Sequence, residues 1–146
     1  MTDRRLRWLT AALALVGLGV SAYLTYTKYA EVRIFCSTNG GCETVQTSKY
    51  ATLGGFLPVP VLGLIGYVGI LVAALLPGRL GLRASVLLAT VAAAFSIYLL
   101  ALQLWVIEAI CVWCLTSEAV SWALFLVAVA RLALSRRRRP VEVAGA

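Results

Sequence analysis

Four cysteines carry the chemistry that this sequence is best equipped to perform. Cys36 and Cys42 lie in a polar stretch, and Cys111 and Cys114 form a Cys-x-x-Cys pair at the start of an apolar stretch. Thiols that open a helix lie near unpaired backbone amides and the positive end of the helix dipole, which favours thiolate formation and thiol–disulfide exchange. The chain contains no histidine, so Cys–His nucleophile pairs and histidine-ligated metal or haem sites are excluded. The two pairs therefore predict an electron relay.

Three other uses of these cysteines compete with the relay. A structural four-cysteine zinc site would need both pairs to close one tetrahedron. Two inert structural disulfides would instead cross-link a loop, as in a nonenzymatic membrane scaffold. Buried cysteines are also found as simple packing residues. Two short spacings within one chain favour the relay, and we assign no metal site.

The elements that position these cysteines are predicted to be membrane-spanning helices. Hydrophobic residues make up 62% of the 146 positions and charged residues 13%, about half the charged share of a soluble domain, so a soluble globular protein is excluded. A spanning helix needs about 20 apolar residues. We therefore predict an all-α membrane protein, a four-transmembrane-helix bundle over residues 1–135, with spans at about 8–28, 59–77, 84–107 and 110–131.

Polar segments separate and follow these spans. Residues 29–58 form a large loop, in which Asn39-Gly40-Gly41 indicates a turn and Glu43–Tyr50 a short surface helix. Residues 136–146 form a basic tail, which we predict to be disordered beyond Pro140. A cleaved signal peptide is the alternative for the first span, because Arg4, Arg5 and Arg7 precede its apolar core.

The net charge of +7 comes from basic residues that flank the apolar stretches. They are not interleaved with aromatic residues along a soluble segment, so no nucleic-acid partner is predicted. Four spans place ten of the 13 lysines and arginines on one side of the membrane, and Lys28, Arg33 and Lys49 on the other. By the positive-inside rule, both termini are cytoplasmic and all four cysteines are extracytoplasmic, in a compartment where disulfides persist.

Helix geometry separates the expected roles of Cys111 and Cys114. A helix that runs inward from this side places Cys114 about 4 to 5 Å deeper in the membrane than Cys111. We expect the deeper thiol to meet a lipid-soluble electron acceptor, and the shallower thiol to face the loop cysteines, which can reach soluble proteins. A quinone is the natural acceptor, because it dissolves in the bilayer and takes the two electrons that formation of one disulfide releases.

The combined motifs resemble the vitamin K epoxide reductase family, specifically its bacterial homologues. Over roughly residues 10–130, the resemblance rests on Cys36, Cys42, Ser48-Lys49-Tyr50-Ala51, Pro60-Val61-Leu62-Gly63 and Cys111-Val112-Trp113-Cys114-Leu115-Thr116-Ser117. It implies a four-helix bundle with a quinone between the helices, capped by the extracytoplasmic loop. It also implies that Cys114 reacts with the quinone and that Cys111 exchanges with Cys42. Cys36 would complete a loop disulfide that oxidises a thioredoxin-like partner.

Departures from relatives narrow the function that the resemblance implies. Val59 stands where the animal enzymes place an asparagine, and Glu118 where they place a tyrosine four residues after the second catalytic cysteine. Quinone-coupled disulfide formation, with menaquinone or ubiquinone as acceptor, is therefore favoured over quinone or vitamin K epoxide reduction proper. Another bacterial family of four-helix disulfide oxidases carries its cysteine pairs in the reverse order.

The resemblance also bears on partner and location. Many bacterial relatives carry a fused thioredoxin-like domain, which we do not expect in this protein, because the 146 residues are accounted for by the spans, the loop and the tail. The expected partner is therefore a separate thioredoxin-like thiol oxidoreductase. The expected location is the bacterial inner membrane.

Two further residues are candidates for quinone binding. Ser48 follows Cys42 in the capping loop, where its hydroxyl could donate to a quinone oxygen; a local turn bond is the alternative. Glu118 lies within the fourth span, where an acid usually faces a bundle interior or a polar cavity. It follows Cys114 by four residues and shares its helix face, so it could donate a hydrogen bond or pass a proton to the quinone. Pairing with an interfacial cation or a neighbouring hydroxyl is the alternative.

Overall fold

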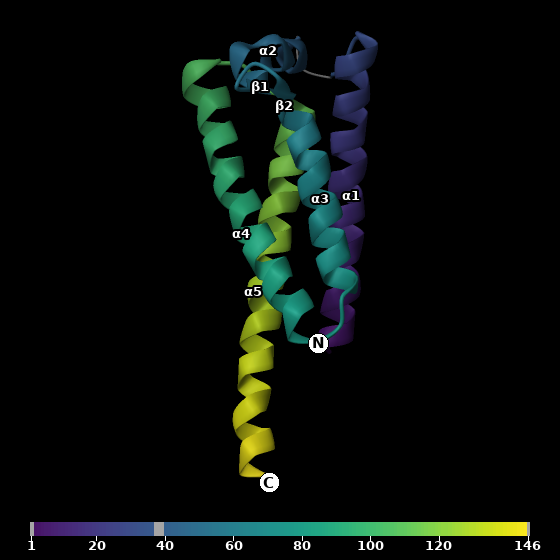
Figure 1. Cartoon of the computed structure of the whole chain (residues 1–146). Coiled ribbons are helices and arrows are strands. Elements are labelled where there is room, and N and C mark those ends of the chain that lie inside the picture. Colours follow the sequence, from purple (N-terminus) through teal and green to yellow (C-terminus); the bar gives the residue numbers. More distant parts are fainter. Residues whose placement is uncertain (1, 37–39, 146) are drawn as a thin grey trace.

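The computed structural model describes residues 2–36 and 40–145, and its long helices run side by side (Figure 1). These helices are α1 (Asp3–Ala30), α3 (Val59–Leu75), α4 (Gly78–Ala101) and α5 (Val112–Ala144). α1 packs against α3 and α5, and α4 packs against the same two helices. The helices therefore enclose a common interior.

Three helical segments of the described chain are long and apolar enough to cross a membrane: α1, Gly78–Val106 and Val112–Pro140. α3 is apolar but shorter, with 17 residues, which rise about 25 Å. Large apolar side chains on all of these helices face outward, among them Leu15, Ile65, Leu87 and Leu126. An apolar surface of this extent is suited to lipid rather than to water.

The apolar core lies where the four long helices meet, and it contains Ala14, Tyr67, Ile70, Ala89, Val120, Leu124 and Ala128. Gly17 allows α1 to approach α3, because a Cβ at Gly17 would lie 2.2 Å from the Tyr67 ring. The Tyr67 hydroxyl donates to the Ser117 carbonyl oxygen at 2.8 Å and lies 3.0 Å from the Ser121 hydroxyl. These bonds satisfy the one polar atom of a buried ring and join α3 to α5.

Helix ends differ from the predicted spans by a few residues. α1 begins at Asp3 rather than near residue 8, because an acidic residue in the first turn stabilises the positive end of the helix dipole. α4 begins at Gly78 rather than residue 84. α3 begins at Val59 with Pro60 in its first turn, as predicted, because a first turn does not use the N–H that proline lacks.

The prediction of a disordered tail is wrong. α5 continues through Pro140 to Ala144 and extends beyond the other helices (Figure 1). Arginine is a strong helix former, and extending an existing helix is far easier than starting one. The run Arg136–Arg139 therefore propagates α5 instead of ending it.

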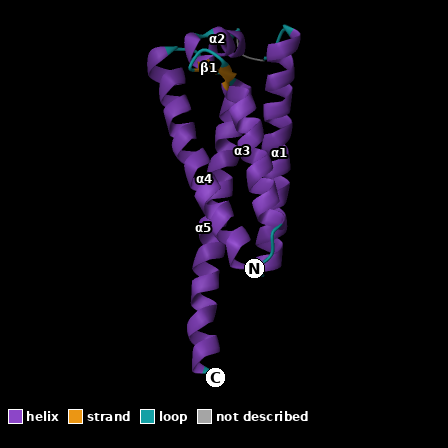
Figure 2. Ribbon diagram, viewed as in Figure 1, coloured by secondary structure: helices purple, strands orange, loops and turns teal. Residues whose placement is uncertain are grey.

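The loop between α1 and α3 is compact and lies across the end of the helices opposite both termini (Figure 2). It contains helix α2 (Gly41–Thr47), a 3-10 turn η1 (Lys49–Ala51), and an antiparallel pair of short strands, β1 (Thr52–Leu53) and β2 (Leu57–Pro58). The predicted short helix is confirmed, divided into α2 and η1, and its position at a membrane surface stays a prediction. In the predicted turn, Gly40 has a positive φ of 76°, and Asn39 lies outside the described residues.

Candidate active site

Cys36 and Cys42 are bonded to each other in the loop. Their disulfide joins the segment after α1 to the first turn of α2, and Cys42 is completely buried. This is the loop pairing that the family resemblance implies. Within residues 2–36 and 40–145, no group of three or more His, Cys, Asp or Glu side chains could hold a metal ion.

Cys111 occupies the N-cap of α5. The Leu115 amide donates to the Cys111 carbonyl oxygen at 2.9 Å, which is the first hydrogen bond of the helix. The Cys114 amide donates to the Cys111 Sγ at 3.3 Å, so the sulfur takes the place of the oxygen in an ordinary N-cap. The predicted opening of a helix by this pair is confirmed.

The environment of Cys111 favours its thiolate. The hydrogen bond from the Cys114 thiol lowers the pKa of Cys111 from 9.0 to about 7. The backbone amides of Cys114 and Trp113 act in the same direction, and burial opposes them. Because the thiolate is the reactive form in thiol–disulfide exchange, both as nucleophile and as leaving group, this environment favours exchange at Cys111.

The loop disulfide packs directly against this thiol. Cys42, Val45 and Cys111 form one buried cluster, with Cys36 and Cys114 packed against it. Gly41 makes the approach possible, because a Cβ there would lie 2.3 Å from the carbonyl oxygen of Ile110. The structure thus brings all four predicted cysteines together at one end of the helices, with Cys42 beside Cys111.

Aromatic side chains from two helices hold the Cys36 half of the loop. The Trp113 indole N–H donates to the Phe35 carbonyl oxygen at 2.7 Å, and the Phe35 amide donates to the Tyr23 hydroxyl at 3.2 Å. The Tyr23 and Trp113 rings pack with centroids 4.7 Å apart. The Lys28 ammonium donates to the Gln46 carbonyl oxygen of α2 at 2.8 Å. α1 and α5 therefore fix both ends of the disulfide-bearing segment.

Cys114 lines an apolar cavity of about 330 Å³ between α1, α3, α4 and α5. Gln46 of α2 and Glu118 of α5 line the same cavity. Gly66 on α3 also lines it, and a Cβ there would meet nothing within 4 Å. Sites for small molecules have volumes of about 300–1,000 Å³, with apolar walls and a few polar groups. The cavity has the size and the lining of such a site.

Two glutamines bond to the Cys-x-x-Cys pair, and one of them, Gln103, also bonds to Glu118. Gln103 lies in η2 (Leu102–Val106), a π-helical turn that continues α4. Its Oε1 accepts from the Cys111 amide at 3.0 Å, and its Nε2 donates to Glu118 Oε1 at 2.7 Å. Gln46 Nε2 donates to the Cys114 Sγ at 3.5 Å. All three polar side chains are buried.

Neither glutamine was among the predicted site residues, although each carried a signal in the sequence. Gln103 interrupts a predicted span with a polar side chain, which is the observation that singled out Glu118. Gln46 follows Cys42 by four residues, so a helix over this segment places both on one face. π-helical turns are also frequent at functional sites, but no sequence pattern announced this one.

Glu118 and Cys114 share one face of α5, as predicted, and both line the cavity. Glu118 Oε2 is buried and has no hydrogen-bond partner among the described residues. This is the polar atom expected of a residue that meets a ligand. Its proposed proton transfer stays a prediction.

Ser48 lies in the loop across the end of the helices, directly after α2. Its hydroxyl donates to the Val45 carbonyl oxygen at 2.8 Å, which is the local turn bond considered as the alternative. It lines a small pocket of about 40 Å³ beside Gln103 and Cys114, and not the larger cavity. Its contact with a quinone stays a prediction.

A loop disulfide packed against a Cys-x-x-Cys pair at one end of apolar helices is the arrangement that thiol–disulfide exchange requires. The chain is a member of the Vitamin K epoxide reductase family, whose sequence profile matches residues 8–129. It is also similar to thiol-disulfide oxidoreductase LTO1 of Arabidopsis thaliana, with 35% identity over 123 residues. The match covers 75% of this chain and 32% of the plant protein, so the chain spans about a third of the length of that relative.

Proposed function

We propose that this protein forms disulfides in a thioredoxin-like partner and passes the electrons to a membrane quinone. The observation that carries the proposal is the position of Cys114, which adjoins Cys111 and also lines the 330 Å³ apolar cavity. A bound quinone, either menaquinone or ubiquinone, accepts two electrons and two protons, which matches the formation of one disulfide.

The residues of the cavity fit a quinone ring. Most of the lining is apolar, and Glu118 Oε2 is a buried oxygen with no protein partner among the described residues. Cys114, Glu118 and Gln46 would hold the ring, with Ser48 in the adjoining small pocket. Val59 lines the same cavity without a polar side chain, so vitamin K epoxide reduction is not proposed.

Thiol–disulfide exchange would first oxidise the partner. Cys36 is less buried than Cys42, so a partner thiolate attacks Cys36, forms a mixed disulfide with it and releases the Cys42 thiolate. The second partner thiolate then attacks its own mixed-disulfide sulfur and releases Cys36. The partner leaves with a disulfide, and the loop pair holds its two electrons.

A second exchange would move these electrons to the helix pair. Cys42 attacks Cys111 of an oxidised Cys111–Cys114 pair, forms a Cys42–Cys111 bridge and releases the Cys114 thiolate. Cys36 then attacks Cys42 and releases Cys111. The loop disulfide is restored and the helix pair is reduced, which is the combination of states seen in the structure.

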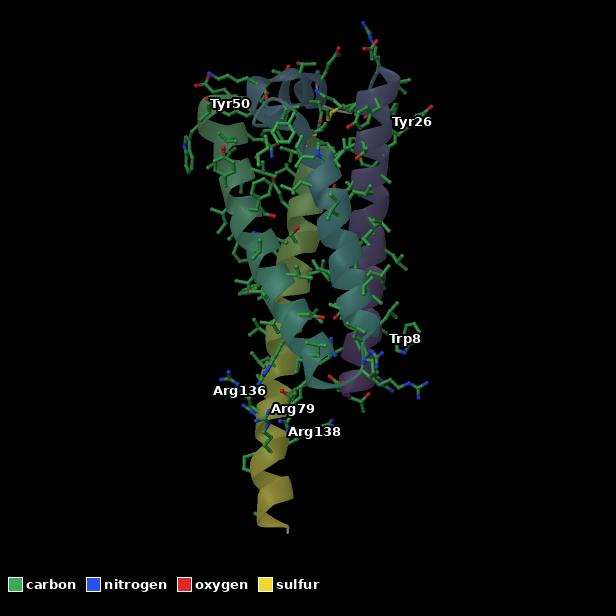
Figure 3. The ribbon with its side chains drawn as sticks, in the orientation of Figure 1. Trp8, Tyr26, Tyr50, Arg79, Arg136 and Arg138 are labelled. Carbon is green, nitrogen blue, oxygen red and sulfur yellow. A yellow bond between two sulfur atoms is a disulfide. The ribbon has the colours of Figure 1, made fainter. Side chains whose placement is uncertain are left out.

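The proposed setting is the bacterial inner membrane, with α3 as a fourth span beside α1, α4 and α5 and with the loop as a cap. The basic residues support this orientation, since Arg79, Arg136 and Arg138 lie at the end opposite Tyr50 (Figure 3). Reporter fusions after Pro77 and Pro140 should read cytoplasmic, and a fusion at Gly40 should read extracytoplasmic. A cytoplasmic signal at Gly40 would contradict this orientation.

A coupled assay tests the function. Purified protein in lipid nanodiscs is given a quinone and a reduced thioredoxin-like protein, and quinone reduction should equal partner disulfide formation. Gly66→Leu places a side chain in the cavity and should raise the apparent quinone KM about tenfold or more. Gly19→Leu is the matched control, since Gly19 is exposed on α1 and also has open space at its Cβ. Partner oxidation without quinone reduction, or equal effects of both variants, would contradict the proposal.

A further inference from the structure

A second cavity, here called the basic cavity, lies at the opposite end of the helices. It has a volume of about 460 Å³ and is lined by residues from α1, from the α3–α4 connection, from α4 and from α5. Seven arginines and one acidic residue, Asp3, are among its lining residues. Arg79, Arg136 and Arg138 lie together at this end (Figure 3). The proposed redox reaction does not use these residues.

Arg131 is the buried residue of the basic cavity, with only 4% of its surface exposed. Its Nε donates to Asp3 Oδ1 at 3.2 Å, and the Asp3 side chain is 52% exposed. Its Nη1 is buried and has no hydrogen-bond partner among the described residues. A buried charged donor without an acceptor is costly, so this site is incomplete without an additional acceptor.

The neighbouring elements increase the positive potential. Gly78, Arg79 and Arg83 line the cavity at the first turns of α4, where backbone N–H groups lack helical partners and the dipole is positive. The last carbonyl oxygens of α3 would repel an anion, but Arg7 engages them. Its Nε donates to the Ala74 carbonyl oxygen at 2.7 Å, and its Nη2 donates to the Leu75 carbonyl oxygen.

We propose that the basic cavity binds a phosphate group, either that of an anionic phospholipid or free phosphate. Guanidinium groups present forked donors that match phosphate oxygens in pairs. Leu76, Leu82 and Leu132 line the same cavity, which gives an attached lipid apolar surface beside its charged group. Basic pockets between membrane helices at the level of the headgroups bind anionic lipids in this way. The volume suffices for a headgroup.

Lipid binding to the whole protein tests the proposal. Protein in phosphatidylcholine nanodiscs is titrated with phosphatidylglycerol in one arm and with inorganic phosphate in the other, and bound lipid and thermal stability are measured. Phosphatidylglycerol should bind at least about tenfold more tightly than phosphatidylcholine and should raise the melting temperature. Stabilisation by inorganic phosphate alone would assign the site to free phosphate.

Matched variants distinguish binding in the basic cavity from a general effect of surface charge. Replacing Arg79 and Arg83 with glutamine should reduce the preference for the anionic ligand about tenfold. Arg33 is also exposed but lies outside the basic cavity, so Arg33→Gln should leave the preference unchanged. Arg131→Gln should abolish the preference for the anionic ligand. If Arg131→Gln fails to fold, the variant with Arg79 and Arg83 replaced still tests the proposal. No preference for either anion, or equal losses in Arg33→Gln, would overturn the proposal.

Discussion

The two ends of the helices leave opposite kinds of buried polar atom without a partner. Among the described residues, two oxygens beside the cysteines, Gln46 Oε1 and Glu118 Oε2, have no partner, whereas in the basic cavity the atom without a partner is a nitrogen, Arg131 Nη1. A buried amide or carboxyl oxygen is satisfied by a hydrogen-bond donor, and a guanidinium nitrogen by an acceptor such as an anion. The helices thus combine one end suited to a ligand that donates hydrogen bonds with one end suited to an anionic ligand.

The two ends also differ in how many of their buried polar groups find hydrogen-bond partners within the protein. The Cys111 amide, Gln103 and Glu118 form a continuous hydrogen-bonded series within the chain. At the other end, Arg131 has one partly exposed partner among many like charges. Changes at the cysteine end should therefore alter reaction rates, and changes at the arginine end should alter stability and ligand preference.

The largest effect is expected from Cys114→Ser. Quinone reduction should fall by about three orders of magnitude or more, because the thiol that faces the cavity is lost. A Cys42–Cys111 bridge should then be detected by peptide mass spectrometry. Thr116→Ala, an exposed change on the same helix, is the control. Absence of the bridge from every oxidised preparation would remove the assigned order of exchange.

Glu118→Gln should slow quinone reduction by about 100-fold or more, because the amide keeps the shape but cannot pass a proton. The pH–rate profile should also lose the ionisation that belongs to this carboxyl group. Steady-state rates over a range of pH, with thermal stability as a check on folding, measure both effects. An unchanged pH–rate profile would return Glu118 to a purely structural role.

Gly41→Ala should slow exchange between the two cysteine pairs by up to about 100-fold, since displacements of about 1 Å are enough for such losses. The added Cβ would lie 2.3 Å from the Ile110 carbonyl oxygen and would push α2 away from Cys111. Gly19→Ala, with open space around it, is the matched control. Rapid-quench thiol trapping measures the rate, and equal rates in the two variants would show that the close approach is unimportant.

The Cys111 thiol should titrate with a midpoint near pH 7 instead of 9.0. Because its pKa is lowered, the thiolate predominates above about pH 7, and Cys111 is a good leaving group when Cys36 attacks Cys42. In a background with Cys36 and Cys42 replaced by serine, thiolate absorbance reports this titration. Cys114→Ala should move the midpoint upward, which lowers the thiolate fraction at pH 7 by up to about 50-fold. A midpoint unaffected by Cys114→Ala would exclude the thiol hydrogen bond as the main cause.

The smallest effect is expected at the arginine end. Asp3→Asn removes the charge that faces Arg131 and should lower the free energy of unfolding by about 1 kcal/mol, since Asp3 is partly exposed and its ion pair is screened. Anionic lipid should reduce that difference by supplying another acceptor. Equilibrium unfolding in nanodiscs with and without phosphatidylglycerol measures both, and a larger difference in the anionic lipid would contradict the assignment.

The redox end was largely predictable because its signals are local. Cysteine spacing, a proline in the first turn of α3 and a charged residue within a span each have a meaning that a few neighbouring residues determine. The position of Glu118 on the face of Cys114 followed from helix geometry alone. The Cys36–Cys42 pairing needed the family resemblance, because spacing does not fix connectivity.

The parts that sequence reasoning missed depend on tertiary packing. Gln46 and Gln103 became meaningful only when α2 and η2 met the first turn of α5. The arginines were interpreted as topology signals, an interpretation that concerns the side of the membrane and says nothing about the burial of Arg131. The helical tail shows the same limit, since local signals at Pro140 predicted an end that the established helix does not make.

The orientation of the Gln103 amide also determines which oxygen of Glu118 can carry a proton. An amide group has one end that accepts and one that donates, and the N–H of Cys111 requires the accepting end to face it. The donating end must then face Glu118 Oε1, so that oxygen can only accept. Any proton that Glu118 carries is therefore held on Oε2, the oxygen left without a partner. A single side-chain amide thus gives the carboxyl group two inequivalent oxygens, one tied to the protein and one available to a ligand.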